Sequence, residues 1–256
     1  MNLLSASTKI CLTALLGCAL VIPPRAFSLT AREIIDLSDR AVRGDSQIAR
    51  YTITIKTRKW TRTMKMTAWD MKKGKKSFSE ITAPKKDEGN RFLLIDKNMW
   101  QYNPRIQKAI KLSPSMMLES WMGSDFTNDD IVKESSIVED YNHTLIGKET
   151  INGNECYKVQ LDPKPDAAVV WGKIIYFART SDYLPVREEF YNEHNVMKKE
   201  LSCADFKKMH DRVIPTRYRM ETVGKKDKFT EMVIDEIQFN VPISPRVFSR
   251  QNLQRR

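Results

Sequence analysis

The sequence is short of the residues that enzyme active sites and metal sites use most. Its 256 residues include four cysteines, three histidines and nine glycines. None of the patterns G-x-S-x-G, H-E-x-x-H or C-x-x-C occurs, and there is no phosphate-binding glycine loop. These are the patterns of hydrolase, zinc, redox and nucleotide sites. The sequence therefore predicts a protein that is not an enzyme and has no metal or cofactor.

The three histidines give no catalytic or metal pattern. His143, His194 and His210 each lie in a polar stretch, without a cysteine or a second histidine at ligand spacing. We therefore expect all three on the exposed surface.

Adjacent carboxylates give no acid–base pair either. Glu188 and Glu189 lie in a predicted strand, where neighbouring side chains point to opposite faces. Asp129 and Asp130 follow Thr127 and fit the first turn of a helix, where negative charge is favoured.

Residues 1–28 have the pattern of a secretory signal. Lys9 precedes the apolar run from Ile10 to Ile22, and the small residues Ala26 and Ser28 fit a cleavage site. The run is shorter than the about 20 residues needed to span a bilayer, although an uncleaved anchor is the alternative. Lipidation at Cys18 is less favoured, since the run continues beyond that residue.

Removing residues 1–28 leaves one predicted domain, residues 29–256. All-β domains of about 200–250 residues are common. The whole chain has a formal charge of +11, and such a surplus favours anionic partners such as lipid headgroups or acidic protein surfaces. Export makes nucleic acid the least suitable of these partners, and we predict none.

Two cysteines, Cys156 and Cys203, remain in the predicted domain. In an oxidising compartment they can form a disulfide if their Cα atoms come within about 7 Å. The alternative is two separate buried thiols.

The predicted domain begins with a helix and continues mostly as strands. Thr30 and Glu33 form a capping box, apolar residues follow at helical spacing, and Gly44 is a natural stop. Alternating apolar and polar residues then predict thirteen strands. They are Tyr51–Ile55, Met64–Ala68, Phe78–Thr82, Phe92–Asp96, Met99–Tyr102, Ile106–Leu112, Tyr141–Thr150, Glu155–Asp162, Gly172–Ala178, Val186–Tyr191, Val196–Phe206, Arg217–Thr222 and Phe229–Phe239. The tail from Ser244 to Arg256 fits a short basic helix.

The segment from Ser113 to Gly123 interrupts this rhythm. It is strongly apolar and has breakers at both ends. It is followed by residues that start a helix, with Thr127 or Asn128 as the cap. We interpret the apolar segment as a lid over the sheet.

Methionine and tryptophan are concentrated in the same half of the chain. Methionine is flexible and polarisable, which suits a surface that accepts varied apolar shapes. One interpretation is a lipid-binding surface, and the other is an ordinary sheet-and-helix core. The candidate lipid-binding residues are Met116, Met117, Trp121 and Met122 in the lid, with Met64, Met66 and Trp100 as the floor.

The stretch from Met122 to Ile131 resembles a family motif. It is similar to the G-S-D-F-[ST]-x-x-D-[IL] signature of outer-membrane lipoprotein-sorting proteins, in the LolA-like superfamily. The motif residues are Gly123, Ser124, Asp125, Phe126, Asp129 and Asp130. Three weaker matches follow in the same order, and the resemblance covers essentially residues 29–256. They are Gly153–Tyr157 opening a strand, Asp182–Pro185 in a turn, and Ile214–Thr216 before a late strand.

This resemblance implies an α+β fold, mainly β, with a curved antiparallel sheet that forms an incomplete barrel. Helices would cover its concave face, with an apolar cavity between them. It also implies a periplasmic protein that takes up acyl chains of a lipid or lipoprotein. The first hypothesis is therefore a periplasmic lipid or lipoprotein carrier. The second is a protein-binding accessory or sensor subunit of an envelope transporter or signalling complex, which uses strand edges and the basic surface.

Overall fold

The computed structural model describes residues 29–256, apart from residues 73–74, 97, 114, 129, 131–136, 166, 168, 226 and 256. The described strands are β1 (Ser46–Lys56), β2 (Thr61–Met71), β3 (Lys76–Ala83), β4 (Arg91–Ile95), β5 (Asn98–Asn103), β6 (Lys108–Lys111), β7 (Tyr141–Ile151), β8 (Asn154–Pro163), β9 (Lys173–Arg179), β10 (Pro185–Tyr191), β11 (Met197–Met209), β12 (Arg212–Thr222) and β13 (Phe229–Phe239). The helices are α1 (Ala31–Val42) and α3 (Arg250–Leu253), with 3-10 turns η1 (Ser115–Leu118), η2 (Trp121–Gly123) and η3 (Pro245–Phe248). The thirteen predicted strands and the mainly β class are confirmed, and so is the short C-terminal helix.

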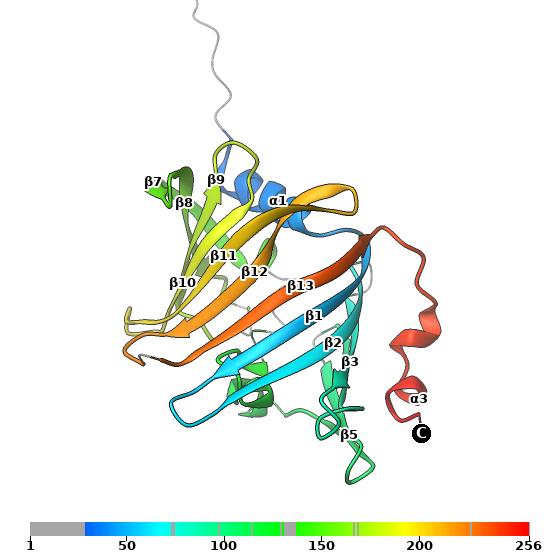
Figure 1. Ribbon diagram of the computed structural model, residues 1–256. Coiled ribbons are helices and arrows are strands. Elements are labelled where there is room, and N and C mark those ends of the chain that lie inside the picture. Colours follow the sequence, from blue (N-terminus) through cyan, green and yellow to red (C-terminus); the bar gives the residue numbers. More distant parts are fainter. Residues whose placement is uncertain are drawn as a thin grey trace, which may run out of the picture.

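All thirteen strands form one curved antiparallel sheet (Figure 1). The order is β6-β5-β4-β3-β2-β1-β13-β12-β11-β10-β9-β8-β7. Two meanders, β1 to β6 and β7 to β13, therefore meet where β1 pairs with β13. The sheet stays open between β6 and β7, which lie at its two edges. This is the predicted incomplete barrel.

The order of the strands forces residues 112–140 to cross the sheet. β6 and β7 are consecutive in the chain but lie at opposite edges. We call the segment that joins them the crossing segment, and its described parts lie against the concave face. Its described side chains pack there on strand residues from both halves of the sheet. The apolar stretch predicted to cover the sheet is part of it.

Helix α1 packs on the same face at one end of the sheet (Figure 1). The capping box of Thr30 and Glu33 is confirmed, and Ile34 and Ile35 are fully buried. Gly44 follows the helix for a different reason than its conformational freedom. A Cβ atom there would lie 2.8 Å from the backbone carbonyl oxygen of Ser46, so only glycine lets the chain pass this close.

The C-terminal residues cover the opposite, convex face. Phe248 and Leu253 are buried against Phe78, Leu93 and other side chains of the β2–β5 region. Of the two α-helices with described bounds, α1 therefore covers the concave face and α3 the convex face, as Figure 1 shows.

The strand β12 begins earlier than predicted. Ile214 and Pro215 lie inside it, whereas the sequence placed them before the strand. β13 pairs with β12 only from Arg217 to Glu221. Pro215 is therefore outside that ladder and pairs only with Phe206 of β11.

Candidate functional site

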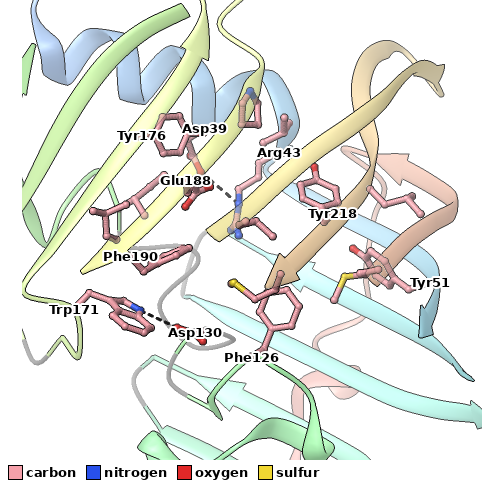
Figure 2. Close-up of a pocket in the computed structure, with 18 of the residues that line it drawn as sticks. Asp39, Arg43, Tyr51, Phe126, Asp130, Trp171, Tyr176, Glu188, Phe190 and Tyr218 are labelled. Atoms are coloured by element: carbon pink, nitrogen blue, oxygen red, sulfur yellow. Dashed lines mark hydrogen bonds and ion pairs between the residues drawn. The ribbon is translucent and has the colours of Figure 1, made fainter. Parts of the chain in front are cut away.

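A cavity of about 180 Å³ lies between the concave face of the sheet, helix α1 and the crossing segment. Its walls are largely aromatic and aliphatic. They include Phe126, Trp171, Ile174, Phe190, Leu201, Met220, Met232, Ile234 and Ile237. Figure 2 shows Tyr51 and Tyr218 on one side of the cavity and Phe190 and Trp171 on the other. A cavity walled in this way favours an apolar ligand.

One end of the cavity, under α1, is polar. Asp39 is buried there and pairs with Lys72 Nζ at 2.7 Å and with Arg43 Nε at 3.4 Å. Burial raises the pKa of Tyr176 well above its usual range, and the hydroxyl is hydrogen-bonded to Ser38 Oγ at 2.8 Å. The charges and hydroxyls at this end are thus held by protein groups.

Asp125 fixes the crossing segment to the sheet. Its buried carboxylate accepts hydrogen bonds from Thr222 Oγ1 at 2.9 Å and Thr230 Oγ1 at 3.0 Å, and pairs with Lys228 Nζ at 2.8 Å. The Asp125 backbone N–H also donates to Thr230 Oγ1 at 2.7 Å. Charged hydrogen bonds of this kind are about twice as strong as neutral ones. The motif aspartate is therefore an attachment point on β12 and β13.

Asp130 makes a second attachment, to β11 and to the residues just before β9 in the same β7–β13 meander. Trp171 Nε1 donates to its Oδ1 at 2.9 Å, and Lys199 Nζ lies 3.1 Å from its Oδ2. Thr127 and Asp130 also cap each other through reciprocal backbone bonds. This identifies Thr127 as the helix cap, while Asp129 lies outside the described residues. Phe126 lies between the two aspartates in the sequence and lines the cavity, as Figure 2 shows.

Gly123 and Ser124 shape the turn before Asp125. Met122 and Gly123 have φ values of 54° and 76°, a left-handed pair that favours glycine at the second position. The Met122 carbonyl accepts a hydrogen bond from Arg62 Nη2, and the buried Ser124 hydroxyl donates to the Phe126 carbonyl at 3.2 Å. The four described motif residues from Gly123 to Phe126 therefore hold the crossing segment in place.

Six of the seven candidate lipid-binding residues come together, but beside the cavity. Met64, Met66 and Trp121 are buried in one apolar cluster with Phe92 and other side chains of β1 to β5. Met116, Met117 and Met122 pack on this cluster, which we call the methionine cluster. None of the six lines the cavity.

Trp100 lies apart from the other six. It packs against the cluster of Phe78 and Phe248 on the convex face, whereas its neighbour Met99 belongs to the methionine cluster. The seven residues therefore do not form one surface.

The structure also decides the alternatives for the remaining polar residues. Cys156 and Cys203 are both buried and no disulfide joins them. Glu188 lines the cavity, while Glu189 on the other face accepts a hydrogen bond from Tyr191 Oη at 2.9 Å. No group of three or more metal-binding side chains occurs among the described residues.

The histidine prediction is correct for two residues and wrong for His143. His194 and His210 are exposed. His143 is half-buried because it lies where the crossing segment reaches β7, with its Nε2 2.8 Å from the Ile137 carbonyl.

His143 makes the stability depend on pH. Burial lowers its pKa below the usual value, so the unfolded chain binds the proton more readily. The contribution of His143 is fully present above about pH 6.5 and is lost as the pH falls through the lowered pKa. We expect His143→Gln to flatten the fall in melting temperature between neutral and mildly acidic pH. A His194→Gln control should leave the profile unchanged, and an unaltered profile for His143→Gln would contradict the assignment.

Sequence reasoning did not find most of the cavity residues. Tyr51, Tyr176 and Tyr218 lie in predicted strands, and their aromatic rings were the available signal. Phe126 and Asp130 were identified through the motif.

In the described part of the chain, no helix combines the length and hydropathy required to cross a bilayer.

Three solved structures have the same architecture. An outer-membrane lipoprotein-sorting domain from Vibrio parahaemolyticus aligns with a TM-score of 0.78 and 22% identity, over 88% of this chain and 98% of that one. A DUF1329 family protein from Desulfovibrio piger aligns with a TM-score of 0.79 and 21% identity, over 88% of this chain and 100% of that one. A LolA superfamily protein from Nitrosomonas europaea aligns with a TM-score of 0.74 and 21% identity, also over 88% of this chain and 100% of that one. At these identities the likeness establishes the fold.

A family model described as "-like: Uncharacterized protein" matches residues 51–255. Among curated proteins, none matches the sequence. The chain therefore belongs to the family of this model, and its fold is that of LolA superfamily proteins and outer-membrane lipoprotein-sorting domains.

Proposed function

We propose that this protein binds an acyl chain of a lipid or lipoprotein, as a carrier or chaperone in the periplasm. The observation that carries the proposal is the apolar cavity enclosed by α1, the sheet and the crossing segment. An exported domain of residues 29–256, released by cleavage after residue 28, is part of the same proposal. Sequencing the N-terminus of the mature protein tests that part.

The cavity is smaller than the about 300–1,000 Å³ of typical ligand sites. A long chain therefore needs more room than the present arrangement gives. The methionine cluster lies beside the cavity, and Met232 and Tyr51 belong to both. In this proposal the acyl chain of the ligand extends out of the cavity, runs beneath the crossing segment and displaces flexible methionine side chains. Met116, Met117 and Met122 then act as the adaptable lid.

Native mass spectrometry of protein purified from the bacterial envelope is the direct test. A carrier should retain lipid that organic extraction removes, and the extracted protein should bind a fluorescent fatty-acyl probe. Protein that is consistently free of lipid and has no affinity for the probe would exclude the proposal.

Filling the cavity should weaken this binding. Met232→Trp places a larger side chain on the cavity wall, and we expect the affinity for the acyl probe to fall about tenfold, the equivalent of about 1.4 kcal/mol. Met197→Trp is the matched control, since Met197 is also a half-buried strand methionine but does not line the cavity. Equal affinities for the two variants would show that the probe binds elsewhere.

The edge strand β7 supports a second function, as a protein-binding accessory or sensor subunit. β7 is the last strand of the sheet, and its Leu145 and Ile146 are 42% and 45% exposed. An added strand of a partner can pair with such an edge. Ile146→Lys should then abolish capture of an envelope protein that is released at high salt. Acyl-probe binding should not change.

A further inference from the structure

Five turns lie side by side along one end of the sheet. They are residues 192–196, 223–228, 57–60, 84–90 and 104–107, and we call them the turn rim. The Val223 N–H donates to the Lys198 carbonyl at 2.9 Å, and Lys56 pairs with Phe229 in the β1–β13 ladder. These contacts place the first three turns in a row.

The other two turns continue this row. Arg62, at the start of β2, lies 3.8 Å from Asp87, and Arg105 Nη2 donates to the Lys86 carbonyl at 2.7 Å. Figure 1 shows the turns after β1 and β5 and those before β11 and β13 along the lower side of the sheet.

Each of four turns on the rim exposes one large apolar side chain. Trp60 is 45% exposed, Ile106 61%, Val196 49% and Val223 52%. Among the described residues at the opposite end of the sheet, only Val213 is comparable. The rim therefore holds half of the exposed large apolar side chains in the described chain, and each lies at a turn.

The rim is also basic. The described residues of its five turns carry seven lysine and arginine residues and four acidic residues. The turns at the opposite end lie within residues 43–45, 72–75, 96–97, 152–153, 180–184 and 210–211. Their described residues carry three lysine and arginine residues and four acidic residues. The excess of positive charge thus lies at the same end as the exposed apolar side chains.

We propose that the turn rim docks onto the surface of a bilayer with anionic lipids. Tryptophan prefers the headgroup region of membranes, and basic residues near an anionic surface each add to the attraction. The apolar side chains are separate points along a row and form no continuous patch. A protein interface needs a contiguous buried core, whereas a fluid bilayer surface accepts separate insertions.

The rim adjoins the crossing segment, although the docking proposal does not depend on acyl-chain binding. Arg62 holds the Met122 carbonyl, and Lys228 of the rim pairs with Asp125. Docking would therefore bring the crossing segment close to the lipid headgroups.

Co-sedimentation of the mature protein with vesicles tests the proposal. We expect binding to vesicles of phosphatidylethanolamine and phosphatidylglycerol, little binding to phosphatidylcholine, and weaker binding at high salt because salt screens the charges. Lys59→Glu combined with Lys225→Glu should weaken binding at least about fivefold for each charge removed. Trp60→Ser combined with Ile106→Ser should reduce binding at low and high salt alike.

Matched controls lie away from the rim. Lys207→Glu changes an exposed lysine of β11, and Val213→Ser changes the exposed valine at the opposite end. Neither should alter vesicle binding, and neither should Met232→Trp, which is aimed at the cavity. Two results would overturn the proposal. One is that the protein binds the phosphatidylglycerol vesicles no more strongly than phosphatidylcholine vesicles, and the other is that rim and control variants lose vesicle binding equally. Failure of the acyl probe to bind would leave it standing.

Discussion

Replacing Asp125 by asparagine is expected to lower the free energy of unfolding by about 2–3 kcal/mol, since hydrogen bonds to a charged group contribute about 1.5–3 kcal/mol. The carboxylate is buried and receives two threonine hydroxyls and one lysine ammonium. An asparagine has nearly the same shape but has one acceptor oxygen and no charge. It cannot satisfy Thr222, Thr230 and Lys228 together. The loss falls below that of a fully buried ion pair, because Lys228 is partly exposed.

The same substitution should release the crossing segment from the sheet. Hydrogen exchange at the amides of Trp121 and Phe126 should speed up, because both donate within the part that Asp125 anchors. The Trp121 N–H donates to the Phe126 carbonyl, and the Phe126 N–H donates to Ser124 Oγ. Urea denaturation and hydrogen exchange measure the two effects.

Asp227→Asn is the matched control for Asp125→Asn. Asp227 is exposed in the neighbouring turn and has a φ of 64°, a conformation that asparagine adopts readily. It should change the free energy of unfolding by less than about 0.5 kcal/mol. If both variants behave alike, Asp125 is not an anchor of the crossing segment.

The strands could be predicted because their information is local. Alternating side chains define each strand, and Asn152 with Gly153 sets the β7–β8 hairpin through two positive φ values, 49° and 79°. The capping box of Thr30 and Glu33 likewise lies within four residues. Such signals need no knowledge of what packs against them.

The cavity could not be placed in the same way. Alternation shows which side chains of a strand face inward, but not which part of the inner face stays uncovered. The Met-rich half looked like the binding surface, and η1 and η2 fill the space above it. The gap lies under α1 instead, beside Tyr176 and Phe190. Only the path of the crossing segment distinguishes these two places.

The roles of the motif aspartates also depend on distant residues. Asp125 meets Thr222 and Thr230, about one hundred positions away, and Asp130 meets Lys199. No local pattern links these residues.

The separation of Trp100 from Met99, in contrast, is a local effect, because adjacent strand residues face opposite sides of the sheet. This separation could therefore be read from the sequence.

Trp121 should be the fixed anchor of the methionine cluster, while the methionines around it adapt. It is 2% exposed and its ring lies 5.6 Å from that of Phe92. We expect Trp121→Ala to lower the free energy of unfolding by about 3–5 kcal/mol, the usual cost of removing a buried aromatic side chain. The loss should appear in urea denaturation followed by circular dichroism of the sheet. If the lid opened independently of the sheet, Trp121→Ala would lower the free energy of unfolding by less than about 1 kcal/mol.

Trp121→Phe separates packing from hydrogen bonding at this position. The Nε1 atom of Trp121 is buried and has no hydrogen-bond partner among the described residues. A buried donor of this kind costs about 1–3 kcal/mol, so phenylalanine relieves that cost while it loses some packing. We expect Trp121→Phe to lie within about 1 kcal/mol of the native protein. If it instead destabilises the protein as much as Trp121→Ala, the indole N–H has a partner, and the site that ligand chains would enter is polar rather than dry.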